Sequence, residues 1–592
     1  MRSPNLDASK EIAMTLSAFR CKRLSPLVGA ATLLAGCAVG PDFVAPPAPD
    51  GTRYGAGSSP STTTSAPVRH GDAQRLLDGA DVPAQWWRLF GSAALDGAIR
   101  TALANSPTLA QAQASLERAQ HDYAAAAGIA QWPAIDARLD AARQQVNIES
   151  MGITAFPSPP PFTLYGASVR VSYVLDLFGA QRRELEGLRA AVDFQRFELE
   201  AARLSLAANV ATAAIREASL RAQIEDTEAL VDAQRRQLAI VEQGVTLGGT
   251  ARVEAERQRG ELAQTETLLP GLTRQLAATR HQLAVYLGLP PAAAAEPVSE
   301  LAGEPAHKAA SASTSGPASE RARQPSSERS NKAASAPTGG PAAEPGADSE
   351  AGQAASNAPA TAVPVFRLAE LRLPDTLPVS LPSTLARRRP DIRAAAALLH
   401  RASADIGVAT ANLYPSLTLS ASAGTQSRSG GDLFDHLNVW NIAAGLVQPV
   451  FRGGALRARQ RAAEAAYRQA LAAHRQAVLQ GLREVADALQ AVHSDAATLR
   501  ARAEAARRAA ATLAIVTEQY RLGGVSQLAL IDAQRQHRET TLALTRASAD
   551  RLADSAALLQ ALGGGWWQTE AEANAGAPPP HRAANPPTTA SR

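Results

Sequence analysis

The stretch from residue 180 to residue 246 constrains the fold more than any other feature, because it contains no proline and follows a seven-residue apolar repeat. The repeat, with one step of four residues, runs through Leu185, Val192, Leu199, Leu206, Ala213, Leu220, Ile224, Val231, Leu238 and Val245. An apolar repeat of seven residues predicts a coiled-coil seam, and the step of four residues is a stutter that locally unwinds it. At about 1.5 Å per residue the predicted helix is on the order of 100 Å long, which few globular domains can contain.

This helix is one arm of a predicted hairpin that occurs twice in the chain. It ends at Gly248 and Gly249, which let the backbone turn, and a return helix is expected from about Thr250 to Leu287. The residue numbers differ by 275 in each of three matching pairs, which are Gly179 and Gly454, Leu247 and Leu522, and Gly288 and Gly563. The constant offset predicts two repeats whose elements have equal lengths.

Two proline pairs precede the hairpins. Pro107 and Pro390 each predict the first residue of a helix, with Ser106 as the N-cap of the earlier one. Pro133 and Pro415 each precede a segment in which apolar and polar residues alternate. These pairs are 283 and 282 residues apart, so the repeats differ by seven or eight residues in this region.

Four segments have the alternation of a strand with one apolar and one polar face. Their apolar positions are Ile135 to Ala141, Tyr165 to Leu177, Leu417 to Ala423 and Trp440 to Leu446, taken at every second residue. Arg170 and Asp176 are placed on the polar face, which suits a wet interior. Each segment has about the length of a tilted strand that crosses a bilayer. A closed barrel needs about eight strands or more, so four strands predict an oligomer, and three copies would supply twelve. The alternative is two soluble hairpins that cover a helical core.

The N-terminus has the layout of a secretory signal, in which basic residues precede the apolar run from Leu24 to Gly36. The run is too short to span a membrane as a helix. It ends in Leu-Ala-Gly followed by Cys37, which resembles the bacterial lipobox and implies cleavage before Cys37 and a covalent lipid on its thiol. Ala38, which is not an aspartate, implies sorting to the outer membrane by the same resemblance. An ordinary signal peptide is the alternative, and Met14 could be the start in place of Met1.

These signals divide the chain into six predicted parts. They are a lipoprotein signal peptide (1–36), a lipidated N-terminal segment with the start of an equatorial region (37–106), a first repeat (107–290), a low-complexity linker (291–363), a second repeat (364–567) and a disordered tail (568–592). The linker and tail are rich in Ala, Pro, Ser and Gly and have no hydrophobic periodicity. Residues 46–67 have the same composition and are expected to be disordered as well.

The composition excludes several other classes of protein. Aromatic residues make up 4% of the chain, and alanine and leucine are abundant, which favours long helices. The net charge of +4 is dispersed, so nucleic acid is not an expected partner. The two cysteines lie before residue 40, and there is no Cys/His cluster for a structural metal. Phosphate-binding, dinucleotide and metalloprotease motifs are missing from the sequence, which predicts a protein without catalytic residues, cofactor or metal.

The chain resembles the outer-membrane factor family of TolC-like channels, in particular its lipoprotein branch, the NodT type. The resemblance covers residues 37–567 apart from the linker, which is longer than this connection usually is in the family. The segments that carry it are 37–43, 86–95, 381–394, 409–415 and 521–534.

The resemblance implies a mainly α-helical fold with a transmembrane β-barrel. Three chains would form a twelve-stranded β-barrel in the outer membrane of a Gram-negative bacterium and a twelve-helix α-barrel in the periplasm. A periplasmic membrane-fusion adaptor and an inner-membrane transporter, of the RND type, would be the partners. The implied function is passive conduction of drugs or other small toxic compounds through a tunnel gated at its periplasmic end.

The resemblance also implies positions for the functional residues. The turns that match the adaptor-docking tips are Leu247, Gly248, Gly249 and Thr250, and Leu522, Gly523, Gly524 and Val525. Asp532 matches a position near the tunnel constriction, where acidic side chains from three chains can favour cations. Its counterpart in the first repeat is Arg257, so a strong acidic ring is not expected. The tryptophans at 86, 87, 566 and 567 are interpreted as packing residues.

Four other functions remain open from the sequence. The same fold could serve type I protein secretion or metal efflux, although three methionines argue against a methionine-lined copper path. A periplasmic adaptor lipoprotein would have one helical hairpin and compact β-domains, whereas this sequence predicts two hairpins and four bilayer-length strands. A structural coiled-coil lipoprotein would not need strands with one polar and one apolar face. The exported substrate cannot be identified from the sequence.

Overall fold

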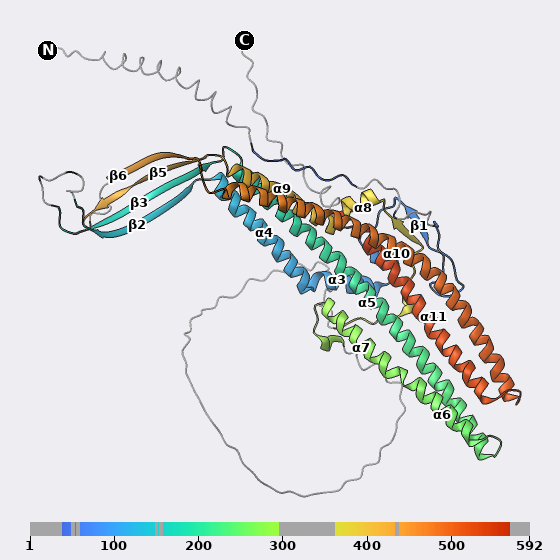
Figure 1. The fold of residues 1–592 in the computed structure, drawn as a ribbon. Helices are drawn as coiled ribbons and strands as arrows, with labels where there is room; N and C mark the ends of the chain where they lie inside the picture. Colours follow the sequence, from blue (N-terminus) through green and yellow to red (C-terminus); the bar gives the residue numbers. More distant parts are fainter. Residues whose placement is uncertain are drawn as a thin grey trace, which may run out of the picture.

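The computed structural model describes residues 38–48, 54, 60–147, 152, 155, 158–294, 362–431 and 437–568. The molecule is elongated, with a four-stranded sheet at one end and the tips of two helical hairpins at the other (Figure 1). The predicted signal peptide, Cys37, residues 295–361 of the linker and residues 569–592 of the tail lie outside the described residues.

The elements follow the predicted two-fold repetition. The first half contains β1 (Arg75–Asp78), η1 (Trp86–Phe90), α3 (Ala93–Asn105), α4 (Pro107–Gln131), β2 (Ala134–Gln144), β3 (Phe162–Leu175), α5 (Ala180–Thr246), α6 (Arg252–Glu266), α7 (Leu268–Tyr286) and η3 (Pro291–Ala294). The second half contains η4 (Leu368–Glu370), β4 (Thr376–Val379), α8 (Pro382–Arg388), α9 (Pro390–Ala411), β5 (Ser416–Ser427), β6 (Val439–Val447), α10 (Ala455–Arg521) and α11 (Gln527–Ala561).

The two long helices, α5 and α10, have the same length. Each contains 67 residues and begins after a glycine with positive φ, Gly179 (81°) or Gly454 (79°). The predicted seam of α5 is confirmed, because Leu199, Leu206 and Val231 are buried in it. The first turns of α4 and α9 begin at the two predicted prolines. Ser106 precedes α4 as expected, but its side chain makes no cap hydrogen bond.

The return arms of the two hairpins differ from each other. The prediction of one continuous helix from about Thr250 to Leu287 is wrong, because the arm is divided into α6 and α7 at Thr267. Pro270 lies in the first turn of α7 and has no N–H to donate to the carbonyl of Glu266, so one helical hydrogen bond is missing at this point. The matching arm in the second repeat, α11, is continuous over 35 residues.

The four predicted strands form one antiparallel sheet in the order β2-β3-β5-β6. The register aligns residues of one character across it. One row is Ala137, Val169, Ala423 and Trp440, and the next is Asp136, Arg170, Ser422 and Asn441. The sheet therefore has one apolar and one polar face. Because β3 pairs with β5, the two hairpins form one sheet, and it lies at one end of the molecule and does not cover the helical core (Figure 1).

One residue placed on the polar face of the sheet has another role. Strand β3 ends at Leu175, so Asp176 lies beyond it in the connection to α5. Its Oδ2 accepts a hydrogen bond from the backbone N–H of Arg182 at 2.9 Å. Asp176 therefore satisfies a free donor in the first turn of α5, and its placement on the polar strand face was wrong.

The largest apolar core lies midway along the molecule, where α5, α10 and α11 meet the N-terminal segment. Trp86, Trp87 and Phe90 of η1 are buried in it, as expected for packing residues, and Trp566 is buried in a smaller cluster. Beside this core, β1 and β4 form a parallel pair that the sequence did not predict.

The interpretation of residues 46–67 as disordered is wrong for the part from residue 60 onward. Thr63 and Ala66 are buried, and Thr62 forms a bridge with Arg75. The Oγ1 of Thr63 accepts a hydrogen bond from Nη2 of Arg551, a fully buried arginine of α11, at 3.0 Å. Hydrogen bonds to a buried guanidinium therefore order this segment, although its sequence has no apolar periodicity.

Within the described residues, none of the helices combines the length and the apolar character needed to cross a membrane.

Candidate functional site

The two hairpin turns have the same backbone geometry. In the first turn, Gly248 adopts a φ of 74° and the N–H of Gly249 donates to the carbonyl of Gly244 at 2.9 Å. In the second, Gly523 adopts a φ of 76° and the N–H of Gly524 donates to the carbonyl of Gln519 at 2.8 Å. Both turns are Schellman motifs, in which a glycine with positive φ closes the last turn of the helix.

The two turns lie at one end of the molecule (Figure 1), and their apolar side chains are exposed to solvent. Leu247 is 79% exposed and Leu522 is 70% exposed, whereas Thr250 and Val525 are half-buried beside them. Leu528, in the first turn of α11, is also exposed. Each tip therefore carries an exposed leucine at the matching position of its turn.

A buried carboxylate joins the two hairpins just above the turns. Glu261 of α6 is fully buried, and its Oε2 accepts a hydrogen bond from Nε of Arg535 at 2.6 Å. Its Oε1 accepts one from Nη1 of Arg538 at 2.8 Å, and the same nitrogen donates to Oγ1 of Thr265 at 2.9 Å. Both arginines belong to α11, so this ion-paired cluster, the Glu261 bridge, connects the return arms of the two repeats.

Further polar contacts extend this connection along α5 and α11. Oγ1 of Thr545 donates to Oδ2 of Asp226 at 2.8 Å, and Nε of Arg546 donates to Oε1 of Gln223 at 2.8 Å. Burial raises the pKa of Asp226 above its ordinary value. The hairpins are therefore joined by hydrogen bonds and charges in the half that is nearer to the turns. A polar contact needs specific partners and is costly when only one partner is left in place.

The predicted gate residues lie near this bridge without taking part in it. Asp532 is exposed on α11, one turn before Arg535, and its charge contributes to the raised pKa of that arginine. Arg257 is exposed on α6, about one turn before Glu261. The structure places both residues at the tip end of the hairpins, and their role in a gate stays a prediction.

Sequence reasoning missed the Glu261 bridge, although α6 carries a signal for it. Ala255, Gln258, Glu261 and Thr265 have the spacing of three and four residues that marks a buried helix face, and all four are buried. Three of these four residues are polar, which indicates a helix that packs against polar partners. The sequence does not identify the arginines that meet them, because Arg535 and Arg538 are about 275 positions away.

Comparison with known proteins identifies the family. Residues 98–289 and 381–564, which cover most of both repeats, match the family described as outer membrane efflux protein. The chain belongs to the outer membrane efflux protein family. Its members are channels. Among the described residues no three His, Cys, Asp or Glu side chains are grouped so that they could hold a metal ion.

Individual relatives in this family match most of the chain. The pyoverdine export outer membrane protein OpmQ of Pseudomonas putida is 28% identical over 485 residues, which cover 81% of this chain and 88% of OpmQ. The antibiotic efflux pump outer membrane protein ArpC of Pseudomonas putida is 26% identical, over 93% of this chain and 98% of ArpC. The solved outer-membrane channel OprN has the same fold, with a TM-score of 0.68 and 23% identity, over 90% of this chain and all of OprN.

Proposed function

We propose that this chain is one subunit of a homotrimeric outer-membrane duct in a tripartite efflux pump. The duct conducts drugs or other small toxic compounds passively from an inner-membrane transporter to the exterior. The observation that carries the proposal is the register of the four-stranded sheet, which aligns apolar residues on one face and Asp136, Arg170, Ser422 and Asn441 in a row on the other.

The edges of this sheet supply the argument for a trimer. Within the described residues, β2 and β6 each have a neighbour on one side, so the opposite side of each strand carries free backbone donors and acceptors. Such edges pair with another strand wherever one is available. Pairing β2 of one copy with β6 of the next closes a barrel, and three copies give about twelve strands, enough for a lumen lined by the polar face.

The helical end of the duct is assigned to the partners. The exposed leucines at 247 and 522 and the adjoining glycine turns form the docking surface for a periplasmic membrane-fusion adaptor, which connects the duct to a transporter of the RND type. Asp532 and Arg257 face the lumen near the tips. The Glu261 bridge holds the two hairpins together in the closed state of this end, so its loss favours the open state.

The membrane end carries the lipid anchor. The proposed mature chain begins at Cys37, which carries a covalent lipid in the outer membrane. The anchor and the barrel are separate attachments, so Cys37→Ser abolishes acylation and leaves the trimer in the membrane.

Mass and conductance of the full chain extracted in detergent test this function. Light scattering should give three copies per particle, negative-stain images should show a long tapered tube, and the particles should conduct ions across a planar bilayer. Monomers or dimers that need no detergent and do not conduct would overturn the duct and favour an adaptor or a coiled-coil lipoprotein.

A further inference from the structure

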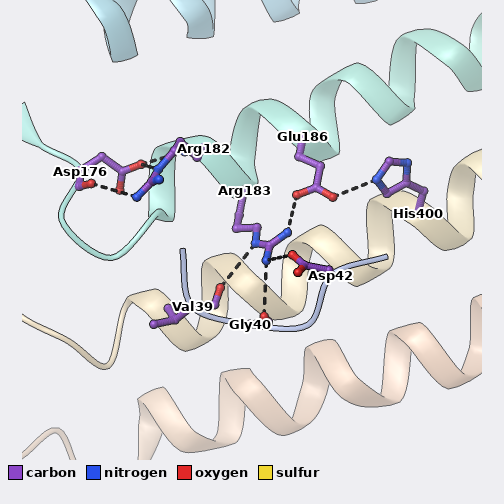
Figure 2. A network of polar contacts seen from close by, with 8 residues as sticks. All are labelled: Val39, Gly40, Asp42, Asp176, Arg182, Arg183, Glu186 and His400. Carbon is purple, nitrogen blue, oxygen red and sulfur yellow. Dashed lines mark hydrogen bonds and ion pairs between the residues drawn. The ribbon is translucent and has the colours of Figure 1, made fainter. Parts of the chain in front are cut away.

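The first described residues of the chain lie against the start of α5, at the level where strands become helices (Figure 2). The N–H of Val39 donates to the carbonyl of Phe178, between β3 and α5, at 3.0 Å. Arg183 of α5 donates from Nε to the carbonyl of Val39 at 3.4 Å and from Nη2 to that of Gly40 at 3.4 Å. The same Nη2 donates to Oδ1 of Asp42 at 2.7 Å. One arginine therefore contacts three of the first five described residues.

The guanidinium of Arg183 is held by Glu186 of the same helix, and Glu186 in turn contacts α9. Arg183 is buried, and its Nη1 donates to Oε2 of Glu186 at 2.7 Å. The other oxygen of Glu186 lies 2.9 Å from Nε2 of His400 in α9, and the His400 ring stacks on Phe43 with centroids 4.4 Å apart. Burial would raise the pKa of Glu186, but hydrogen bonds from Arg183 and His400 outweigh it and keep the pKa below its ordinary value. We call this group of contacts the Arg183 clamp. Its members are Asp42, Phe43, Arg183, Glu186 and His400.

Glycines allow the N-terminal segment to pack closely against α5 and α9. A Cβ on Gly407 of α9 would lie 2.7 Å from Cγ of Arg183, and one on Gly40 would lie 2.5 Å from Cα of Gly407. A Cβ on Gly179 would lie 2.7 Å from Cα of Ala38. Gly40 and Gly179 also have positive φ angles of 101° and 81°. The segment approaches both helices so closely that larger residues do not fit at these positions.

Aromatic and apolar side chains surround the same level of the molecule. Phe178 stacks on Tyr414, which lies between α9 and β5, with centroids 4.8 Å apart. Trp132 lies between α4 and β2, and Val450 and Phe451 lie between β6 and α10, and all three are highly exposed. Aromatic residues at the ends of membrane strands lie at the boundary between hydrocarbon and lipid headgroups.

We infer that the Arg183 clamp docks the N-terminal segment at the helix–strand junction and so fixes the height at which a lipid on the preceding residue enters the bilayer. Arg183 is then a positioning residue for the anchor. The inference rests on the proposed membrane location of the sheet and on the proposed acylation of Cys37. The inference assigns the N-terminal segment a binding site on α5 and α9, which an anchor on a flexible tether would not need.

A nitroxide at position 44 tests the clamp in the full chain in outer-membrane vesicles. Val44 is exposed, two residues beyond Asp42, and Val44→Cys gives the processed, acylated chain its one free thiol, because the sequence has cysteines at 21 and 37 alone. In this background Arg183→Gln should make the label several-fold more mobile. The matched control is Arg182→Gln, because the side-chain hydrogen bonds of Arg182 within the described residues go to Asp176. An unchanged spectrum in Arg183→Gln would overturn the clamp.

Two further variants keep the test decisive if Arg183→Gln does not fold. Asp42→Asn removes a carboxylate that is 91% exposed, so it leaves the helices intact and should mobilise the label partially. Gly407→Ala removes no charge but occupies the space of the Arg183 side chain, and it should displace the segment as well. Retention of the parent spectrum in both variants, with normal trimer content, would contradict the inference.

Two controls separate this inference from the proposed function. Mass spectrometry of the N-terminal peptide reports acylation. An unmodified Cys37 would remove the anchor, and the label would then be attached to Val44→Cys in a Cys21→Ser, Cys37→Ser background, where it still reports the clamp alone. Lipids brominated near the headgroup should quench Trp132, with the loss absent in Trp132→Phe. Deeper bromines should quench Trp440 of β6, which the register aligns with Val169 near the middle of β3. Failure of shallow quenching at Trp132 would place the junction away from the membrane surface and overturn the assignment of height.

Discussion

The buried carboxylate of Glu261 and the guanidinium of Arg538 connect the two repeats at 2.8 Å, with one residue on each return arm. Glu261→Gln should weaken this contact, because two arginines then face an amide in place of a charge. Removing one partner of a buried ion pair costs on the order of 3 kcal/mol. We expect a lower melting temperature and a higher single-channel conductance in planar bilayers.

The matched control for this variant is Glu256→Gln. Glu256 lies on the same helix and pairs with Arg259, and both side chains are about half exposed. An exposed pair of this kind contributes roughly 0 to 1 kcal/mol, so conductance should stay at the parent value. Equal conductance in the two variants would exclude the Glu261 bridge from control of the tip end.

The two faces of the sheet can be separated by adjacent substitutions in β5. Ala421 is in an apolar row with Val171 and Ile442, whereas Ser420 is in the row of Ser172 and Ala443 on the other face. Ala421→Arg should reduce the amount of membrane-inserted trimer, because arginine on a lipid-facing strand costs about 2 to 4 kcal/mol. Ser420→Arg should insert normally and alter ion selectivity. The reverse result would assign the polar face to lipid.

An acidic pair between α10 and α11 predicts a pH dependence. Burial, a hydrogen bond with Asp554 and the charges of Asp554 and Asp550 raise the pKa of Asp495 from 3.8 to about 7. Arg551 opposes this rise. The folded protein therefore binds a proton that the unfolded chain has released. The contribution of Asp495 to the stability of the fold is present at low pH and is lost as the pH rises through 7.

Thermal melting between pH 5 and 8.5 measures this dependence. The melting temperature of the parent should fall across the interval, and Asp495→Asn should flatten the curve and stabilise the protein at the alkaline end. Asp487→Asn, at an exposed carboxylate on the same helix, is the control and should keep the parent slope. A parent curve that rises with pH would contradict the shared proton.

The break between α6 and α7 predicts a stabilising substitution. Pro270→Ala restores an N–H that can donate to the carbonyl of Glu266 and should join the two helices. Removing an internal proline can contribute up to about 3 kcal/mol. Hydrogen exchange should slow for amides around residues 267–271 and remain unchanged in α11. Faster exchange there would mean that Pro270 is required for packing.

Much of this fold could be predicted, because its largest elements are periodic. The heptads of α5 and the glycine turns locate the hairpins, and alternation locates the strands. Pairings between distant short segments could not be predicted. Strand β1 has four residues and its partner begins at Thr376, about 300 positions away. The Arg183 clamp and the Glu261 bridge likewise depend on single residues whose partners no local pattern identifies.

The equal lengths of α5 and α10 make the two arms matched spacers. Both cover the distance from the four-stranded sheet to the hairpin turns with 67 residues. Deleting one heptad from α5 alone would shorten its arm by about 10 Å and leave the two tips at different depths. The length of each arm is therefore set by its number of residues, and this number is the same in both repeats. Any variant of different reach has to change both copies by the same number of turns.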